Sequence, residues 1–289
     1  MKVSGFTFIR NAIKYDYPIV EAIQSILPLC DEVVVAVGNS EDETLALIQN
    51  IDPKIRVIET IWDDNLREGG RTLALETDKA YAAISEDSDW AFYIQGDEVL
   101  HERYLPVIKE AMLAYKDDQK VDGLLFNYKH FYGSYDYIGT SISWYPDEIR
   151  IVRKRKDIYS YRDAQGFRKG DDEKLSVKRI PAWMYHYGWV KPPEKMQLKQ
   201  ESFHKMWHDD AWMQENVKTV KEFDYTENID ALARFEESHP NVMQDRIATK
   251  NWKFEYDISF NRIKPKDKVK YFLRKYLGVD IRYKNFVEL

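Results

Sequence analysis

Cysteine is nearly absent from the sequence: Cys30 is the single one among 289 residues, which excludes a disulfide-stabilised scaffold. Apolar runs approaching the roughly 20 residues of a membrane-spanning helix are also missing. The first residues, Met1 to Phe6, lack the long apolar stretch of a secretory signal peptide. These absences predict a cytosolic protein built as one large globular domain, or as one domain with an appendage.

Aromatic residues, in contrast, are abundant, with 8 Trp, 20 Tyr and 13 Phe making 14% of the chain. This content excludes low-complexity disorder, because disordered segments lack the side chains that build a core. The net charge of −6 is unevenly distributed. Residues 264–284 hold eight bases and two acids, a net charge of +6, which leaves −12 for the remainder. An acidic body with a basic tail predicts two surfaces with different partners.

Hydrophobic periodicity predicts strands that alternate with helices over the first half of the chain. The predicted strands are Val3–Ile9, Val33–Val37, Ile55–Ile61, Trp90–Ile94 and Val121–Tyr128. This alternation is typical of βαβ units, so we expect an α/β fold with a mostly parallel sheet and helices on both faces. The aromatic-rich stretch Tyr128–Tyr187, with one strand at Ile149–Val152, predicts an antiparallel or irregular lid over the rim of the sheet. Further helices are expected at Glu194–Trp207, Ile229–Glu237 and Lys266–Leu277.

Three polar clusters follow directly on predicted strands: Arg10-Asn11, Gly38–Thr44 and Gln95–Glu98. Ligands of open α/β sheets bind outside the carboxyl ends of the strands, so the three clusters should converge on one rim. Asp97 and Glu98 there are suited to hold a divalent cation whose coordination is completed by substrate phosphate oxygens. The alternative is that the two acids cap the following helix.

Four segments in order resemble a family 2 glycosyltransferase of GT-A (Rossmann-like) fold over about residues 1 to 130. They are Phe8–Asn11, Asp31–Val35 with Ser40–Thr44, Gly70-Arg71, and Asp89–Glu98. The resemblance implies transfer of a sugar from a nucleotide-diphosphate sugar to a saccharide or lipid-linked saccharide, with inversion, in cell-surface polysaccharide synthesis. It implies Mn²⁺ or Mg²⁺ as cofactor.

The same resemblance implies a GT-A domain over residues 1–215 and a helical C-terminal region over 216–289. Residues 1–125 would form the nucleotide-sugar-binding half and 126–215 the acceptor-side half. Nucleotide-sugar binding is implied for Arg10, Asn11, Asn39, Ser40, Asp42 and Arg71.

The DXD motif of the family falls on Gln95-Gly96-Asp97, which implies that Asp97 binds the metal, with Glu98 and His186 as further ligands. The sequence departs from the family pattern at Gln95, which replaces the first acid, and at Val37-Gly38, which replaces an acid after the second strand. Alternatives remain open for three residues: Arg71 as an exposed helix residue, Asp42 as a turn or helix cap, and His186 as a neutral core histidine.

An inverting transferase needs a carboxylate that takes the proton of the acceptor hydroxyl. Asp163 is the predicted base, and Glu148 is the second candidate. The aromatic segments 131–137 and 144–147 suit sugar binding, with ordinary core packing as the alternative.

The segment Lys266–Leu277 places apolar residues on one helical face and cations on the other. This pattern is typical of a helix lying on the inner, anionic face of a membrane. Docking of its apolar face on the body is the alternative, and nucleic acid is excluded as a partner because no recognised binding motif is present.

Two other functions remain: a sugar-phosphate nucleotidyltransferase, or a non-catalytic carbohydrate-binding or assembly protein. The first strand lacks the glycine-rich, basic loop that a nucleotidyltransferase needs, whereas Gln95 keeps the second alternative open.

Overall fold

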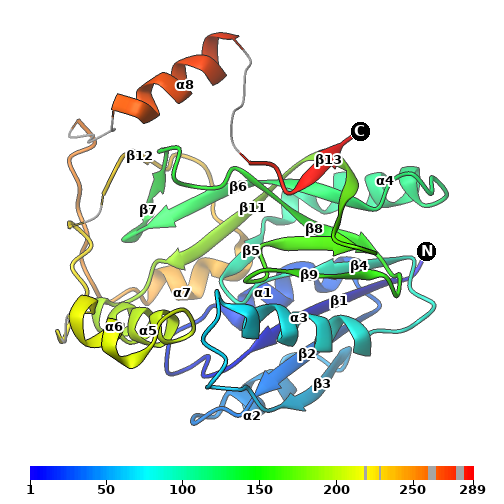
Figure 1. Ribbon diagram of the computed structural model, residues 1–289, viewed down its shortest axis with the longest axis horizontal. Helices are drawn as coiled ribbons and strands as arrows, with labels where there is room; N and C mark the ends of the chain where they lie inside the picture. The colour runs from blue at the N-terminus through cyan, green and yellow to red at the C-terminus, as the bar shows by residue number, and fades with distance from the viewer. Residues whose placement is uncertain (218–219, 228, 260–264, 278–282) are drawn as a thin grey trace.

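One mixed β-sheet organises the chain in the computed structural model, which describes residues 1–217, 220–227, 229–259, 265–277 and 283–289 (Figure 1). Its strands lie in the order β3-β2-β1-β4-β8-β6-β11-β10-β9. The first four pair in parallel: β1 (Val3–Ile9), β2 (Glu32–Gly38), β3 (Ile55–Thr60) and β4 (Trp90–Tyr93). The chain runs outward from β1 to β3 and then crosses to β4 on the other side of β1. The sheet therefore has a topological switch point between β1 and β4.

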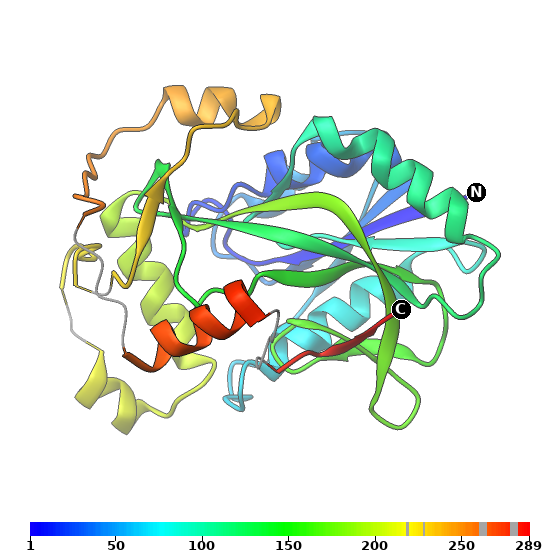
Figure 2. The ribbon, with the colours of Figure 1, turned by 90° about the horizontal axis from the view of Figure 1, so that it is seen from above.

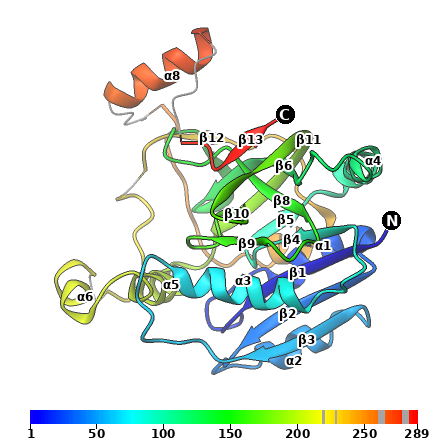
Figure 3. The same ribbon diagram turned by 45° about the vertical axis from the view of Figure 1, so that its right-hand side comes forward.

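Helices cover both faces of this sheet (Figure 3). The connecting helices are α1 (Ile19–Ile26), α2 (Thr44–Gln49), α3 (Arg71–Ala83) and α4 (Leu105–Tyr115). Ile23 of α1 and Met112 of α4 pack with Trp90 on one face, while Tyr81 of α3 packs with Phe6 on the other. The five buried residues Val33–Val37 of β2 alternate between these two cores, which explains their continuous apolar run. The predicted α/β class with helices on both faces is confirmed.

Residues beyond β4 extend the sheet. The added strands are β5 (Glu98–Leu100), β6 (Gly123–Tyr132), β7 (Ser134–Gly139), β8 (Asp147–Arg153), β9 (Ile158–Tyr161), β10 (Gly166–Lys169) and β11 (Glu173–Trp189). β8 lies antiparallel between β4 and β6, and β6 pairs in parallel with the long β11. The stretch Tyr128–Tyr187, predicted to be an antiparallel or irregular lid, contributes strands to the main sheet instead. The strand predicted at Ile149–Val152 is confirmed within β8, which is antiparallel to both of its neighbours. Long-range pairing of β6 and β11 determines this region, and local aromatic content does not reveal such pairing.

The C-terminal region is mixed rather than helical. Its elements are α5 (Pro193–Lys205), α6 (Asp210–Asn216), β12 (Leu232–Arg234), α7 (Gln244–Ala248), α8 (Pro265–Leu277) and β13 (Phe286–Glu288), with a 3-10 turn at Asn241–Met243. Two further 3-10 turns, Leu27–Leu29 and Glu102–Tyr104, lie in the first half of the chain. The helices predicted at Glu194–Trp207 and Lys266–Leu277 are confirmed. The one predicted at Ile229–Glu237 is wrong, because Leu232–Arg234 pairs with the edge strand β7. Figure 2 shows β13 lying beside β11, with which it pairs.

Helix α8 stands away from the sheet in Figures 1 and 3. Its apolar side chains are open to solvent, with Val269 59%, Phe272 54% and Leu277 61% exposed. Docking of this face on the body is therefore not the arrangement of the described helix. Lys264 and residues 278–282 of the predicted basic tail lie outside the described residues. Within the described chain, none of the helices combines the length and the apolarity needed to cross a bilayer.

Candidate active site

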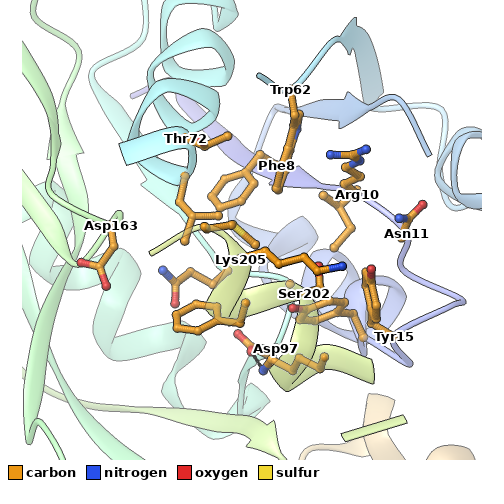
Figure 4. A pocket seen from close by; sticks show the side chains of 18 of the residues that line it. Phe8, Arg10, Asn11, Tyr15, Trp62, Thr72, Asp97, Asp163, Ser202 and Lys205 are labelled. Carbon is orange, nitrogen blue, oxygen red and sulfur yellow. Dashed lines mark hydrogen bonds and ion pairs between the residues drawn. The ribbon is translucent and has the colours of Figure 1, made fainter. Parts of the chain in front are cut away.

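A cavity of about 820 Å³ opens where the carboxyl ends of β1 and β4 meet, at the topological switch point (Figure 4). Helix α5 covers it with side chains from Leu198 to Met206. Predicted site residues that line the cavity are Arg10, Asn11, Asp97, Glu148, Asp163 and His186. Segments far apart in the sequence thus meet at the predicted rim.

Asp97 is the buried acid at the end of β4, and three basic side chains surround it. Lys199 of α5 donates to Asp97 Oδ2 at 3.0 Å and to the Gly188 carbonyl at 2.8 Å. His186 Nε2 lies 3.8 Å from Asp97 Oδ1. Burial alone would raise the pKa of Asp97, but Lys199, His186 and the buried Lys191 more than offset it and hold this pKa well below its usual value. Asp97 is therefore ionised at neutral pH.

Glu98, adjacent in the chain, is fully buried and faces away from the cavity. Its Oε1 accepts from Arg150 Nη2 and from the Tyr128 hydroxyl, both at 2.7 Å, and its Oε2 accepts from Arg150 Nε at 2.8 Å. The backbone N–H of Gln95 donates to the same Oε2 at 3.1 Å. These four bonds occupy both carboxylate oxygens. The predicted metal role of Glu98 is replaced by a structural one: it joins the β4 turn to β8 and β6.

The acceptor atoms left for a cation are Asp97 Oδ1 and His186 Nε2. A carboxylate oxygen beside an imidazole nitrogen fits a divalent ion such as Mn²⁺ better than Mg²⁺, which prefers oxygen ligands. Among the described residues, no cluster of three or more His, Cys, Asp or Glu side chains is placed to hold a metal. Two protein ligands therefore fit a cation whose remaining ligands are substrate oxygens and water.

His186 is one of two histidines in contact. Its Nδ1 lies 3.0 Å from Nδ1 of His130, whose Nε2 lies 2.6 Å from the Tyr145 carbonyl oxygen. Burial, together with the neighbouring His186, lowers the pKa of His130 to about 3, so the His130 ring is neutral at physiological pH. Burial also lowers the pKa of His186, against the opposing effect of Asp97.

Arg10 and Trp62 form the opposite side of the cavity from Asp163 (Figure 4). The Arg10 guanidinium lies 5.6 Å from the centre of the Trp62 ring and donates to both carboxylate oxygens of Asp64, at 2.5 and 3.2 Å. The hydrogen bond from Arg10 lowers the pKa of Asp64. A flat indole ring and a guanidinium are thus held side by side.

The predicted nucleotide-binding residues after β2 bond to the loops that follow β1 and β3 and do not line the cavity. Asn39 accepts from the backbone N–H of Trp62 at 3.1 Å, and Ser40 accepts from the backbone N–H of Asn11 at 3.0 Å. Asp42 accepts from the Lys14 N–H at 2.7 Å and from Thr44, which is the turn role left open above. These bonds fix the loop, and Asn11 itself has the left-handed φ of 55°. Position after a strand does not by itself distinguish loop-forming from ligand-facing side chains.

Arg71 also lies outside the lining of the main cavity. Its side chain is 65% exposed and 4.0 Å from Glu68, in a neighbouring shallow depression. The structure therefore favours the alternative of an exposed helix residue over contact with a diphosphate.

Asp163 lies in a tight turn between β9 and β10, where Arg162 and Ala164 have left-handed φ angles of 56° and 64°. Such backbone costs about 1–3 kcal/mol per residue and is found mostly at functional sites. Gln95, at the first DXD position, donates to the Ala164 carbonyl at 3.2 Å and so holds this turn. Gly70 allows close approach, since a Cβ there would lie 2.7 Å from Asp163 Cβ.

The two candidate bases differ in protonation. Asp163 Oδ1 is buried without a hydrogen-bond partner among the described residues, and burial raises its pKa. Burial raises the pKa of Glu148 much further, to about 8; Arg150 opposes this effect, and Asp147, Glu98 and Asp163 add to it. Glu148 is therefore mainly protonated at pH 7, so Asp163 is the better proton acceptor of the two.

Lys199 and Trp62 are two of the lining residues that the sequence did not indicate as part of the site. Lys199 lies on α5 and reaches Asp97 across 102 positions of sequence. A lysine on a predicted helix is ordinarily solvated, so no local signal marks it. The aromatic segments near 131–147 contribute Tyr145 to the lining, whereas Phe131, Tyr135 and Tyr137 are buried in the core.

Comparison with known proteins gives structural neighbours only. No family model matches the chain, and no curated protein matches its sequence. A Staphylococcus aureus TarS fragment in complex with UDP shares 16% identity over 70% of this chain and 64% of its own, with a TM-score of 0.39. The same fragment has been solved with UDP-GlcNAc. Glucosyl-3-phosphoglycerate synthase from Mycobacterium tuberculosis, in complex with Mn²⁺, UDP and glucosyl-3-phosphoglycerate, shares 22% identity over 45% of this chain, with a TM-score of 0.29.

This chain spans less than two thirds of each of these neighbours, 64% of the TarS fragment and 44% of the synthase.

Proposed function

We propose that the chain is a glycosyltransferase that uses a nucleotide-diphosphate sugar. The observation that carries the proposal is the constellation in one cavity at the switch point: an ionised Asp97 flanked by His186 and Lys199, and a separate, half-buried carboxylate, Asp163, that lines the same cavity. Transfer of a sugar from a diphosphate donor requires a carboxylate that can bind a cation and a separate carboxylate that acts as the base.

The donor would lie between the Trp62 side and Asp97. The rings of Phe8 and Trp62, whose centres are 5.9 Å apart, offer apolar faces to a nucleobase. Lys199 and Arg10 supply positive charge for the diphosphate in a body whose net charge is negative. A divalent ion held by Asp97 and His186 would stabilise the charge that develops on the departing nucleoside diphosphate.

In the reaction, Asp163 accepts the proton of the acceptor hydroxyl as that oxygen forms a bond to the anomeric carbon of the sugar. The bond from the anomeric carbon to the diphosphate oxygen breaks, and the nucleoside diphosphate leaves with the electron pair. Attack from the face opposite the leaving group inverts the configuration. Asp163 remains protonated until solvent takes the proton.

The acceptor proposed is a saccharide or a lipid-linked saccharide destined for a cell-surface polysaccharide. The protein would act in the cytoplasm, with α8 resting on the inner face of the membrane. The exposed apolar residues of that helix support this position.

The decisive experiment is calorimetric titration with UDP-GlcNAc and UDP-Glc, with Mn²⁺ or with EDTA, on the wild type and on Asp97→Ala. We expect Mn²⁺-dependent binding that Asp97→Ala weakens by at least about tenfold, because one buried charge contact of about 1.4 kcal/mol corresponds to that factor. Glu110→Ala, a change at an exposed acid on α4, is the matched control and should bind like the wild type.

Other outcomes favour the alternatives. Release of pyrophosphate from a nucleoside triphosphate and a sugar phosphate would indicate a nucleotidyltransferase. Binding of oligosaccharides without any nucleotide binding would indicate a carbohydrate-binding protein, and would refute the proposed transfer.

A further inference from the structure

His130 and His186 form a buried pair across two neighbouring strands. The two residues are directly opposite in the parallel register of β6 and β11, so their side chains lie on the same face of the sheet. His130 is 3% exposed, and its ring stacks between Tyr128 and Trp144. Their Nδ1 atoms are 3.0 Å apart, which requires one proton between them.

The position of that proton follows from the other nitrogen of His130. Its Nε2 lies 2.6 Å from the Tyr145 carbonyl oxygen, and a carbonyl oxygen can only accept. Nε2 of the neutral His130 ring therefore carries the hydrogen, and Nδ1 is bare. The proton between the two rings must then belong to His186 Nδ1. A neutral His186 consequently has a bare Nε2.

This bare nitrogen faces Asp97 Oδ1 at 3.8 Å, so two acceptors face each other. Lys199 neutralises the other oxygen of the carboxylate, Oδ2, at 3.0 Å. Gly188 keeps the neighbouring space free, because a Cβ there would lie 2.6 Å from His186 Nε2 and 2.7 Å from Asp97 Oδ2. A cation is the kind of ligand that a carboxylate oxygen and a bare imidazole nitrogen bind together.

We infer that His130 is a positioning residue for a divalent cation. Its hydrogen bond selects the tautomer of His186 whose bare Nε2 faces Asp97. His130 lies behind His186 and acts only through it. The hydrogen-bond chain runs from the Tyr145 carbonyl through both imidazoles to the cavity. The inference rests on the proposed function, because the cation is the one that would accompany the diphosphate of the donor. Outer hydrogen bonds of this kind fix ring orientation and alter metal affinity.

Three substitutions test this role by electron paramagnetic resonance titration of Mn²⁺ in the presence of UDP, corrected for Mn²⁺ bound to UDP alone. His130→Phe keeps a ring but loses the acceptor, and should weaken Mn²⁺ binding by about 10- to 100-fold. His130→Asn places an amide oxygen where Nδ1 was, and should retain most of the affinity. His239→Phe is the matched control: His239 is a second histidine bonded to a backbone carbonyl, that of Tyr135 at 3.1 Å, outside the cavity lining.

A double-mutant cycle separates action through His186 from a general loss of structure. His186→Ala removes the ligand, so His130→Phe should cause no further loss of Mn²⁺ affinity in that background. An equal loss in both backgrounds would overturn the inference. So would equal affinities of His130→Phe and the wild type.

The tautomer can also be read in the wild type alone, from ¹⁵N shifts of labelled imidazoles. We expect His186 with its proton on Nδ1, and a proton on Nε2 would overturn the inference. Failure of this inference can be distinguished from failure of the proposed function. Equal UDP-sugar binding in EDTA and in Mn²⁺ would reject the cation role but not the proposed glycosyltransferase function. No nucleotide binding under either condition would reject both the cation role and the proposed function.

Discussion

Asp97 and Glu98 are neighbours in the chain with opposite surroundings. Asp97 faces the cavity and carries one free oxygen, whereas Glu98 is enclosed by Arg150 and Tyr128. A buried ion pair of this kind is costly to break, about 3–5 kcal/mol when one partner is removed. Loss of activity on substitution of Glu98 would therefore report unfolding of the β4 turn, and of the two acids Asp97 is the one whose substitution reports on the cation.

Glu148 should make donor binding depend on pH. Burial raises its pKa to about 8, so the cavity gains a negative charge as the pH rises through that value. We expect the KM for the UDP-sugar to rise about tenfold between pH 7 and pH 9, equivalent to about 1.4 kcal/mol of repulsion. Glu148→Gln mimics the protonated acid and should have the wild-type KM at pH 7 and a flat profile above it.

Glu148 also determines whether the free energy of unfolding rises or falls with pH. Between about pH 4.5, the ordinary value, and pH 8, the unfolded chain releases this proton while the folded protein keeps it. The free energy of unfolding of the wild type should therefore fall with rising pH relative to Glu148→Gln. Parallel pH profiles for the two proteins, in KM and in urea unfolding, would contradict the assigned state of Glu148.

Asp163 should behave differently from Glu148. Asp163→Asn removes the proposed proton acceptor and should lower kcat by at least about 100-fold, the usual contribution of a positioned base. Because Asp163 lies on the far side of the cavity from Arg10, UDP binding by calorimetry should be unchanged (Figure 4). Ser160→Ala, in the same turn region, is the control for local disturbance. A parallel loss of UDP binding in Asp163→Asn would assign this residue to donor binding instead.

At the scale of single elements, α5 covers the cavity, a role that the sequence suggested for the aromatic stretch Tyr128–Tyr187. Its lysine at position 199 bonds to Asp97 and its last turn reaches the loop before α3, where Gly70 N–H donates to the Met206 carbonyl at 3.4 Å. Access to the cavity therefore depends on a helix that belongs to the C-terminal half of the chain.

Helix α8 should bind anionic membranes through its exposed apolar face. The helix sequence holds five bases and one acid, and Val269 and Phe272 are more than half exposed. Burying such side chains contributes about 1.5–3 kcal/mol each, and each nearby cation adds about 1 kcal/mol on an anionic surface. Sedimentation with phosphatidylglycerol-containing vesicles should pellet the wild type, and Val269→Ser/Phe272→Ser should reduce pelleting by at least about tenfold.

Two exposed apolar residues elsewhere provide the matched control for that experiment. Ile61 is 79% and Leu113 53% exposed, so Ile61→Ser/Leu113→Ser removes similar surface away from α8. This variant should pellet like the wild type. Equal pelleting of all three proteins, or equal pelleting with purely zwitterionic vesicles, would reject membrane attachment through α8.

At the scale of the whole molecule, the sequence predicted what depends on local periodicity. β1 was placed at its observed bounds, and the polar cluster that holds Asp97 was expected directly after a strand, where β4 ends. What it missed depends on contacts between distant segments: Lys199 reaching Asp97, Arg150 enclosing Glu98, and the pairing of β6 with β11. Local patterns do not contain the partner of a long-range contact, so the arrangement around the predicted acids required the structure.

The sheet itself argues against two halves that fold separately at residue 125. β4 pairs with β8, and Trp90 and Phe92 pack in one core with Ile151 and Met184 from beyond that boundary. A fragment of residues 1–125 would leave the β4 edge and these side chains uncovered, which favours unfolding or aggregation. We expect a poorly dispersed amide NMR spectrum for this fragment, and recovery of the native spectrum when residues 126–289 are present with it. A well-dispersed spectrum and a cooperative urea transition of the fragment alone would instead establish residues 1–125 as an independent nucleotide-sugar-binding domain.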